Sequence, residues 1–410
     1  MERLQNNSVV SDEGTDVCNK MKYTNGVGAC AGEDKPISNL QLGRQRIDSL
    51  QALRAWAFLG IFFYHAMFFV SWPSLGVCIF FVMSGFLMMY RYENVEIFVS
   101  PKNNLIFSLN RIKKLYPLHV ITTIFAIALS MVIVVYHGID LKSVIKLIAK
   151  IGLNLTLLQT WVPHHKVNVS LNGVAWYLSV TMFLYFMFPW IRNMIKSKSI
   201  IQLLVICGIV LIVEIVSCIP FIMFLGKDSP VYIWFMYCFP FFRLGDFFIG
   251  CVLKRLFSET NVRFIGGGKA TIIEMLACIV TVLVLLWITK EQSNVFLCAL
   301  HNPTTIFIPI AAIWVLLFAI NQGLLTKMLS NKLTIFIGNI SAYAFLIHYV
   351  ITQYVLHLLS YMNIEVNLLQ RTILVFAELV VSIEISVLYK KFHDKYIVHH
   401  FFEQEAKFGK

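Results

Sequence analysis

Charged residues are scarce in this 410-residue chain, where they make up 14% of the sequence. Soluble globular proteins carry about a quarter. Hydrophobic residues reach 58%, and the mean hydropathy is +0.73. Apolar runs long enough to cross a bilayer recur along most of the chain. This composition excludes an ordinary soluble domain and predicts a multi-pass membrane protein.

Other features that the sequence lacks narrow the class further. The apolar segments do not alternate with polar residues, which excludes a membrane β-barrel. The nine cysteines form no CxxC pair, and several lie within apolar runs, which argues against a disulfide framework or a metal site. The net charge is +12, but no run of basic and aromatic residues resembles a nucleic-acid surface. We therefore expect neither a metal nor a nucleic-acid partner.

The first 46 residues lack apolar periodicity and also lack the apolar core of a signal peptide. We predict a disordered cytoplasmic tail over 1–46, a transmembrane domain over 47–390 and a cytoplasmic tail over 391–410. Ten spans are expected, which gives an all-α polytopic protein: 53–71, 75–90, 117–136, 176–194, 200–224, 231–253, 271–288, 304–320, 333–357 and 371–389. Lysine and arginine gather in alternate loops, which predicts that both termini are cytoplasmic.

Residues 137–175 fit this scheme least well. The stretch 141–162 is apolar, but it carries Lys142, Lys146 and Lys150 at four-residue spacing. Such a stripe predicts an amphipathic helix at the outer membrane interface. An eleventh span is the alternative, and it would invert every later loop and place the basic clusters outside.

The first span holds two ionisable residues, Arg54 and His65. Eleven residues of helix separate them by roughly 16 Å, which puts the cation near a membrane surface and the imidazole near mid-bilayer. Ionisable groups inside a span usually face a cavity or a functional pathway. A neutral histidine could accept the proton of a hydroxyl group that attacks a thioester. The simpler alternative is a buried histidine bonded to a neighbouring helix.

A basic loop, NRIKKLYP (110–117), precedes the third span. On a helical turn Arg111 and Lys114 would share a face suited to a phosphorylated ligand. Ordinary cytoplasmic loop charge explains the same residues equally well.

Four further stretches could carry chemistry. Ser84 lies in GVCIFFVMSGF (76–86), and Trp176 and Tyr185 lie in WYLSVTMFLYFMFP (176–189). Arg243 could pair with Asp246 inside the sixth span, and His348 lies inside the ninth. Helix packing and an interfacial aromatic belt are the structural alternatives for the first two stretches.

Taken in order, these stretches resemble the acyltransferase-3 family of bacterial inner-membrane O-acyltransferases. The resemblance covers roughly 47–390 and rests on six motifs: Arg54 and His65 with ten residues between them, FFVMSGF (80–86), RxxK before Tyr-Pro (111–117), WYLSV followed by a tyrosine and a proline (176–189), FRLGDFFIG (242–250) and SAYAFLIH (341–348). The chain is similar to the stand-alone branch, which has no fused hydrolase-like domain.

The resemblance implies transfer of an acyl group, by default acetyl from acetyl-CoA, to a sugar hydroxyl of a surface polysaccharide or its lipid-linked precursor. It implies residence among the lipids of the inner (plasma) membrane. His65 would be catalytic with Arg54 as its partner. The acyl-CoA site would include Arg111, Lys114, Tyr116 and Ser84, and the carbohydrate site Trp176, Tyr185, Arg243 and His348.

The sequence departs from the family pattern at two positions. Lys114 replaces the second arginine of RxxR, which keeps the charge but loses the bidentate fork. Thr181 stands where relatives often have glutamate, so no acid role follows there. Two other functions remain open from the sequence: a flippase for a lipid-linked sugar or acyl carrier, and a glycan polymerase.

Overall fold

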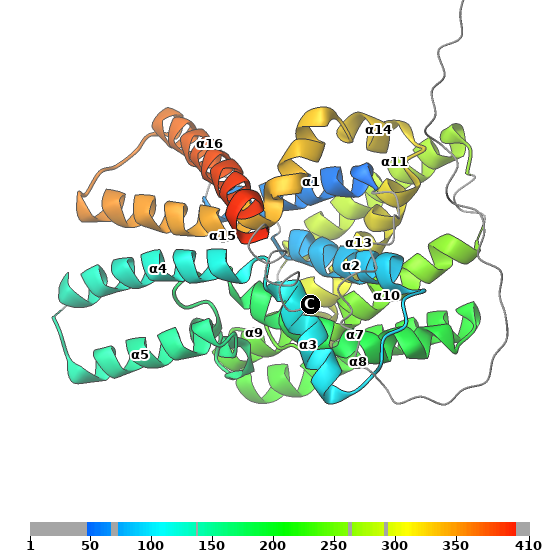
Figure 1. The fold of residues 1–410 in the computed structure, drawn as a ribbon, viewed down its shortest axis with the longest axis horizontal. Coiled ribbons are helices and arrows are strands. Elements are labelled where there is room, and N and C mark those ends of the chain that lie inside the picture. Colours follow the sequence, from blue (N-terminus) through cyan, green and yellow to red (C-terminus); the bar gives the residue numbers. More distant parts are fainter. Residues whose placement is uncertain (1–46, 67–72, 137, 261–264, 291–293, 399–410) are drawn as a thin grey trace, which may run out of the picture. The chain divides into compact units, whose positions relative to one another are not determined.

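The computed structural model describes residues 47–66, 73–136, 138–260, 265–290 and 294–398, so the expected tail 1–46 lies outside it. Every regular element in these ranges is helical, which confirms the all-α prediction (Figure 1). A 3₁₀ turn covers Gln159–Trp161, and a π-helical turn covers His393–Val398, within the expected tail 391–410. The α-helices are α1 (Asp48–His65), α2 (Pro73–Tyr92), α3 (Pro101–Ile112), α4 (Tyr116–Tyr136), α5 (Leu141–Leu155), α6 (His165–Asn168), α7 (Trp176–Lys196), α8 (Ile200–Leu225), α9 (Pro230–Tyr237), α10 (Leu244–Glu259), α11 (Gly267–Ile288), α12 (Val295–Leu300), α13 (Pro303–Ile320), α14 (Leu324–Leu329), α15 (Lys332–Tyr361) and α16 (Leu368–Phe392).

Eight of the described helices are long and apolar enough to cross a membrane: α2, α4, α7, α8, α11, α13, α15 and α16. The first expected span forms α1, which is not among the eight. Its 18 residues include Asp48, Gln51 and Arg54, which make its first turns polar. The expected end of this span, 67–71, lies outside the described residues.

The sixth expected span differs from the prediction because it is not one helix. The segment 231–253 divides into α9 and α10, with a turn at 238–243 between them. Pro240 lies in that turn, where its missing N–H cannot continue a helical ladder. The break places Arg243 at the N-terminal end of α10 instead of in the middle of a span.

The amphipathic segment forms α5, which ends at Leu155, short of the expected Val162. Figure 1 shows α5 turning back beside α4, and the two helices are in contact. The interior side of its end is polar: Nε2 of His119 donates to the Asn154 carbonyl at 3.0 Å, and the Asn154 amide donates to Ser170 at 3.2 Å. Its position relative to the lipid surface stays a prediction.

The core that positions the candidate site is built from α1, α2, α10, α13 and α15. α1 and α15 cross closely at Gly338, which has no Cβ. A Cβ added there would collide with the backbone of Gln51. A second contact joins His65 to His348 further along both helices. The two contacts follow the same chain direction, so α1 and α15 run parallel and their histidines meet at the same level.

Candidate active site

Two histidines that are 283 positions apart in the sequence face each other. Nδ1 of His65 on α1 lies 3.1 Å from Nε2 of His348 on α15. Their rings stack with centroids 5.3 Å apart and 30° between the planes. His348 is fully buried, whereas His65 is partly exposed. The pair therefore has a fully buried inner member and a partly exposed outer member.

The hydrogen bonds fix which nitrogen of each neutral ring carries the proton. Nδ1 of His348 lies 3.1 Å from the Ala344 carbonyl, which can only accept, so Nδ1 is the donor. Nε2 of His348 is then the acceptor, and it receives the Nδ1–H of His65. This chain of donors leaves Nε2 of His65 without a proton. A second histidine and a backbone carbonyl thus leave Nε2 of His65 able to accept a proton.

Aromatic rings surround the pair. Phe58 packs edge-on against His348 with centroids 5.6 Å apart, and Phe345 lies at 5.9 Å. Tyr349 meets the edge of His65 at 5.1 Å and an angle of 85°. Tyr349 itself fills the space above Gly173, where a Cβ would come within 2.5 Å of the phenol ring. These contacts hold both imidazoles in one orientation.

A residue that the sequence analysis did not single out holds the end of α1. The Arg371 guanidinium donates to the carbonyl of Ala66, the residue after His65. A cation at the start of a span is expected from topology alone, so no local pattern predicts its contact 305 positions away. In the structure it satisfies a terminal carbonyl of the helix that carries His65.

An aromatic cluster extends from the histidines to Arg243. Phe345 contacts Tyr177 at 5.5 Å, and Tyr177 stacks on Phe81 at 4.5 Å. The guanidinium of Arg243 lies over the Phe81 ring, 4.8 Å from its centroid. Trp176 joins the cluster through Phe81 at 6.1 Å. The predicted residues Trp176, Arg243 and His348 therefore belong to one contiguous set of contacts.

Arg243 and Asp246 form the buried ion pair that the sequence suggested, at 2.9 Å with side chains 0% and 1% exposed. Arg243 also reaches the Cys78 sulfur at 3.5 Å. Glu214 on α8 lies beside this pair and accepts from Thr305 at 3.1 Å. A buried charge pair held from several helices fixes how those helices pack, and removing one partner would leave a charge uncompensated.

Ser84 and Tyr185 were predicted for different subsites, and the structure brings them together. Their hydroxyl oxygens lie 3.1 Å apart, with Ser84 buried. Thr181 uses its hydroxyl within α7, where it donates to the Tyr177 carbonyl at 2.7 Å. Tyr116 donates to the Leu155 carbonyl at 2.8 Å, which ties the start of α4 to the end of α5.

Basic side chains from several elements gather around Lys114, in the connection between α3 and α4. Partial removal from water lowers the pKa of Lys114, Lys390 and Arg54 lower it further, and Asp394 opposes them. Arg91 on α2 contributes in the same direction as Arg54. The ammonium also lies 5.7 Å from the centre of the Tyr343 ring. We call Arg54, Arg91, Lys114 and Lys390 the basic cluster; its excess of positive charge suits an anionic ligand.

Arg111 and Lys114 do not share a helical face, because α3 ends at Ile112 between them. This corrects the geometry that the spacing suggested. The Arg111 guanidinium donates to the Tyr92 hydroxyl and lies 5.6 Å from the Phe107 ring centre. Lys114 has different neighbours. Within the described ranges, no group of three histidine, cysteine, aspartate or glutamate side chains could hold a metal ion.

Comparison with known proteins identifies the family. The model of the Acyl_transf_3 family, described as an acyltransferase domain, matches residues 47–389, so the chain belongs to this family. This confirms the resemblance that its motifs suggested.

One curated relative is Acyltransferase MdmB of Streptomyces mycarofaciens, which is 26% identical over 236 residues. The match covers 51% of this chain and 57% of that protein, so the chain spans little more than half of the relative's length. No solved structure matches the chain.

Proposed function

We propose that this protein transfers an acetyl group from acetyl-CoA to a hydroxyl group of a surface glycan or its lipid-linked precursor, in the inner (plasma) membrane. The observation that carries the proposal is the His65–His348 pair, which leaves an unprotonated Nε2 on the partly exposed ring. Membership of an acyltransferase family supplies the reaction class.

The reaction needs one base and one acid, and His65 can act as both. Its Nε2 takes the proton of the sugar hydroxyl while that oxygen attacks the thioester carbonyl. The tetrahedral intermediate then collapses, the carbon–sulfur bond breaks, and the CoA sulfur takes the proton from Nε2. His348 stabilises the transient imidazolium through the Nδ1–H bond. A route through an acetylated residue of the enzyme uses the same proton transfers in two stages.

The donor would bind at the basic cluster. Acetyl-CoA carries several phosphate charges at one end and its thioester at the far end of a long flexible arm. Arg54 in that cluster and His65 share α1 and are separated by roughly 16 Å along its axis. Phosphates bound beside Lys114 would therefore leave the arm to reach towards His65, while the acceptor approaches from the other end of α1.

Replacing His65 by alanine tests the proposal in detergent-purified protein. We expect ester formation from radiolabelled acetyl-CoA and host glycan to fall at least 100-fold, since general base catalysis contributes roughly 10²–10⁴-fold. His357→Ala is the matched control, because this exposed histidine lies on α15 outside the pair. Unchanged ester formation in His65→Ala contradicts the mechanism. Absence of ester formation in the purified wild type would instead favour a flippase, which needs two membrane-separated compartments.

A further inference from the structure

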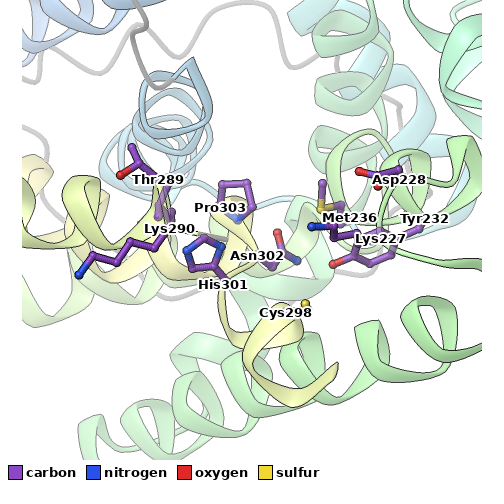
Figure 2. A pocket seen from close by; sticks show the side chains of 11 residues that line it. Lys227, Asp228, Tyr232, Met236, Thr289, Lys290, Cys298, His301, Asn302 and Pro303 are labelled. Atoms are coloured by element: carbon purple, nitrogen blue, oxygen red, sulfur yellow. The ribbon is translucent and has the colours of Figure 1, made fainter. Parts of the chain in front are cut away.

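A pocket of about 270 Å³ lies where α8 and α11 end and α13 begins. Lys227 and Asp228 follow α8, Tyr232 belongs to α9, and His301 precedes α13 (Figure 2). Pockets for drug-sized ligands have roughly 300–1,000 Å³, so this one suits a single small ring. None of the predicted site residues lines it.

The pocket is separated from the aromatic cluster by one helix. α9 forms a wall of the pocket with Tyr232 and Met236. The next residue, Tyr237, packs on Trp176 with ring centroids 4.8 Å apart. Trp176 begins α7 and touches Phe81. In the ten-span scheme, this is also the end of the bundle at which α1 finishes with His65. A chain-like acceptor could therefore occupy both places.

The side chains that line the pocket include both hydrogen-bond donors and hydrogen-bond acceptors. Figure 2 shows the ammonium of Lys227 and the hydroxyl of Tyr232 directed towards Asn302. The His301 ring is fixed because its Nε2 donates to the Trp287 carbonyl at 2.8 Å, which leaves its Nδ1 as an acceptor in the neutral ring. Asp228 adds a carboxylate on the side of Lys227.

Sugar hydroxyl groups match such a mixture because each can donate and accept. A phosphate group can only accept at its charged oxygens, and the Asp228 carboxylate would repel it. The second lysine does not change this balance, since the side chain of Lys290 extends away from Lys227 in Figure 2. Met236 and Pro303 add apolar surface for the carbon–hydrogen face of a sugar ring.

We infer that this pocket binds one sugar unit of the acceptor glycan, apart from the unit that is acetylated. The inference rests on the proposed function for the identity of the acceptor. It assigns Lys227, Asp228 and His301 to glycan recognition and gives them no part in the chemistry at His65.

Cys298 lines the same pocket and provides a local probe. Detergent-purified protein is treated with iodoacetamide, and mass spectrometry follows alkylation of Cys298 with and without methyl glycosides of glucose, galactose, N-acetylglucosamine and glucuronic acid at millimolar concentrations. We expect at least one glycoside to slow the reaction about twofold, as half-occupancy requires. Alkylation of Cys207, which lies within α8 away from the pocket, should not change.

Variants tie the protection to the pocket. Lys227→Ala and Asp228→Ala should abolish it, whereas Lys290→Ala should retain it as the matched control. The inference is overturned if no glycoside protects Cys298, if inorganic phosphate protects it as well as any sugar does, or if protection survives in Asp228→Ala. His65→Ala should keep full protection while losing ester formation. Protection in a wild-type protein that forms no sugar ester would uphold the pocket and reject the proposed reaction.

Discussion

A histidine works as a general base only if the nitrogen facing its substrate lacks a proton. In this protein the Ala344 carbonyl can only accept a hydrogen bond, so it places the proton of His348 on Nδ1. Nε2 of His348 then accepts from Nδ1 of His65 at 3.1 Å, which leaves Nε2 of His65 without a proton. In the proposed mechanism this arrangement replaces the carboxylate of a serine protease triad, which holds the imidazole in one tautomer. A carboxylate would add a buried charge, and a neutral histidine avoids that cost.

Replacing His348 tests this orienting role. His348→Met removes the acceptor for Nδ1–H of His65, whereas His348→Gln keeps a carbonyl oxygen near the position of Nε2. We expect kcat to fall roughly 100-fold or more in His348→Met, within the range for a misoriented base, and clearly less in His348→Gln. The Michaelis constant for acetyl-CoA should stay unchanged in both. Equal losses in the two variants would show that His348 only fills space.

The lowered pKa of Lys114 in the basic cluster predicts how kcat/KM for acetyl-CoA depends on pH. Because the pKa of Lys114 is lowered, its ammonium loses the proton at a lower pH than an ordinary lysine does. If the charged form binds the donor, kcat/KM for acetyl-CoA falls as the pH rises through that lowered pKa. Lys390→Met removes a repelling neighbour, so the fall should move to higher pH. In Lys114→Arg, which stays charged, the fall should vanish. An identical alkaline limb in all three proteins contradicts a role for Lys114.

The sequence could supply the residues of the site but not their pairing. His65 and His348 were each noticeable as histidines in apolar segments, since such residues are rare within spans. Their partnership depends on the register of α1 against α15, which no local pattern encodes. The contacts of Arg371 and Lys390 could not be predicted for another reason, since cations at span ends are expected from topology alone.

At the scale of elements, glycines decide how close the helices come. A Cβ at Gly85 would collide with the Phe247 carbonyl, and one at Gly250 with the Val82 carbonyl. The Cys251 thiol also donates to the Gly85 carbonyl at 3.3 Å. α2 and α10 therefore touch backbone to backbone, as small residues permit in membrane helices. This close crossing positions Ser84 beside Tyr185 and Phe81 beneath Arg243.

Gly250→Ala should loosen that crossing. We expect a loss of about 1–3 kcal/mol in stability, the usual effect of overpacking a tight contact. Thermal unfolding of the detergent-purified protein measures it as a lowered midpoint. Gly208→Ala is the matched control, because no atom lies within 4 Å of its added Cβ on α8. An equal midpoint for Gly250→Ala and wild type would show that α2 and α10 can separate freely.

Hydropathy predicted the position of most helices because long apolar runs in lipid have few alternatives to a helix. It failed at the sixth span, where apolar composition continues through the turn at 238–243. Pro240 lies in that turn, but a proline alone does not end a helix here, since Pro189, Pro220 and Pro309 lie inside other helices of this chain. Whether a proline kinks a helix or ends it depends on neighbouring helices that can bond the released backbone groups.

At the scale of the whole membrane domain, the features that the proposed reaction uses divide between its two ends. The basic cluster includes Arg54 in the first half of α1, and His65 is at the other end of that helix. The sugar pocket lies where α8 and α11 end, the side on which the ten-span scheme also places the end of α1. Such a division suits an enzyme that takes a cytosolic thioester and an acceptor outside the membrane.

Sealed vesicles of opposite orientation test this division. With both termini in the cytoplasm, inverted vesicles expose the basic cluster to added acetyl-CoA, and glycan trapped in the lumen faces the His65 end. We expect ester formation in inverted vesicles loaded with glycan, and little in right-side-out vesicles given acetyl-CoA outside. Permeabilising the membrane should restore activity in the second case, because both substrates then reach both ends. If intact right-side-out vesicles use external acetyl-CoA as well as inverted vesicles do, the donor need not enter from the cytoplasmic end. The proposed division between the two ends of the domain is then wrong.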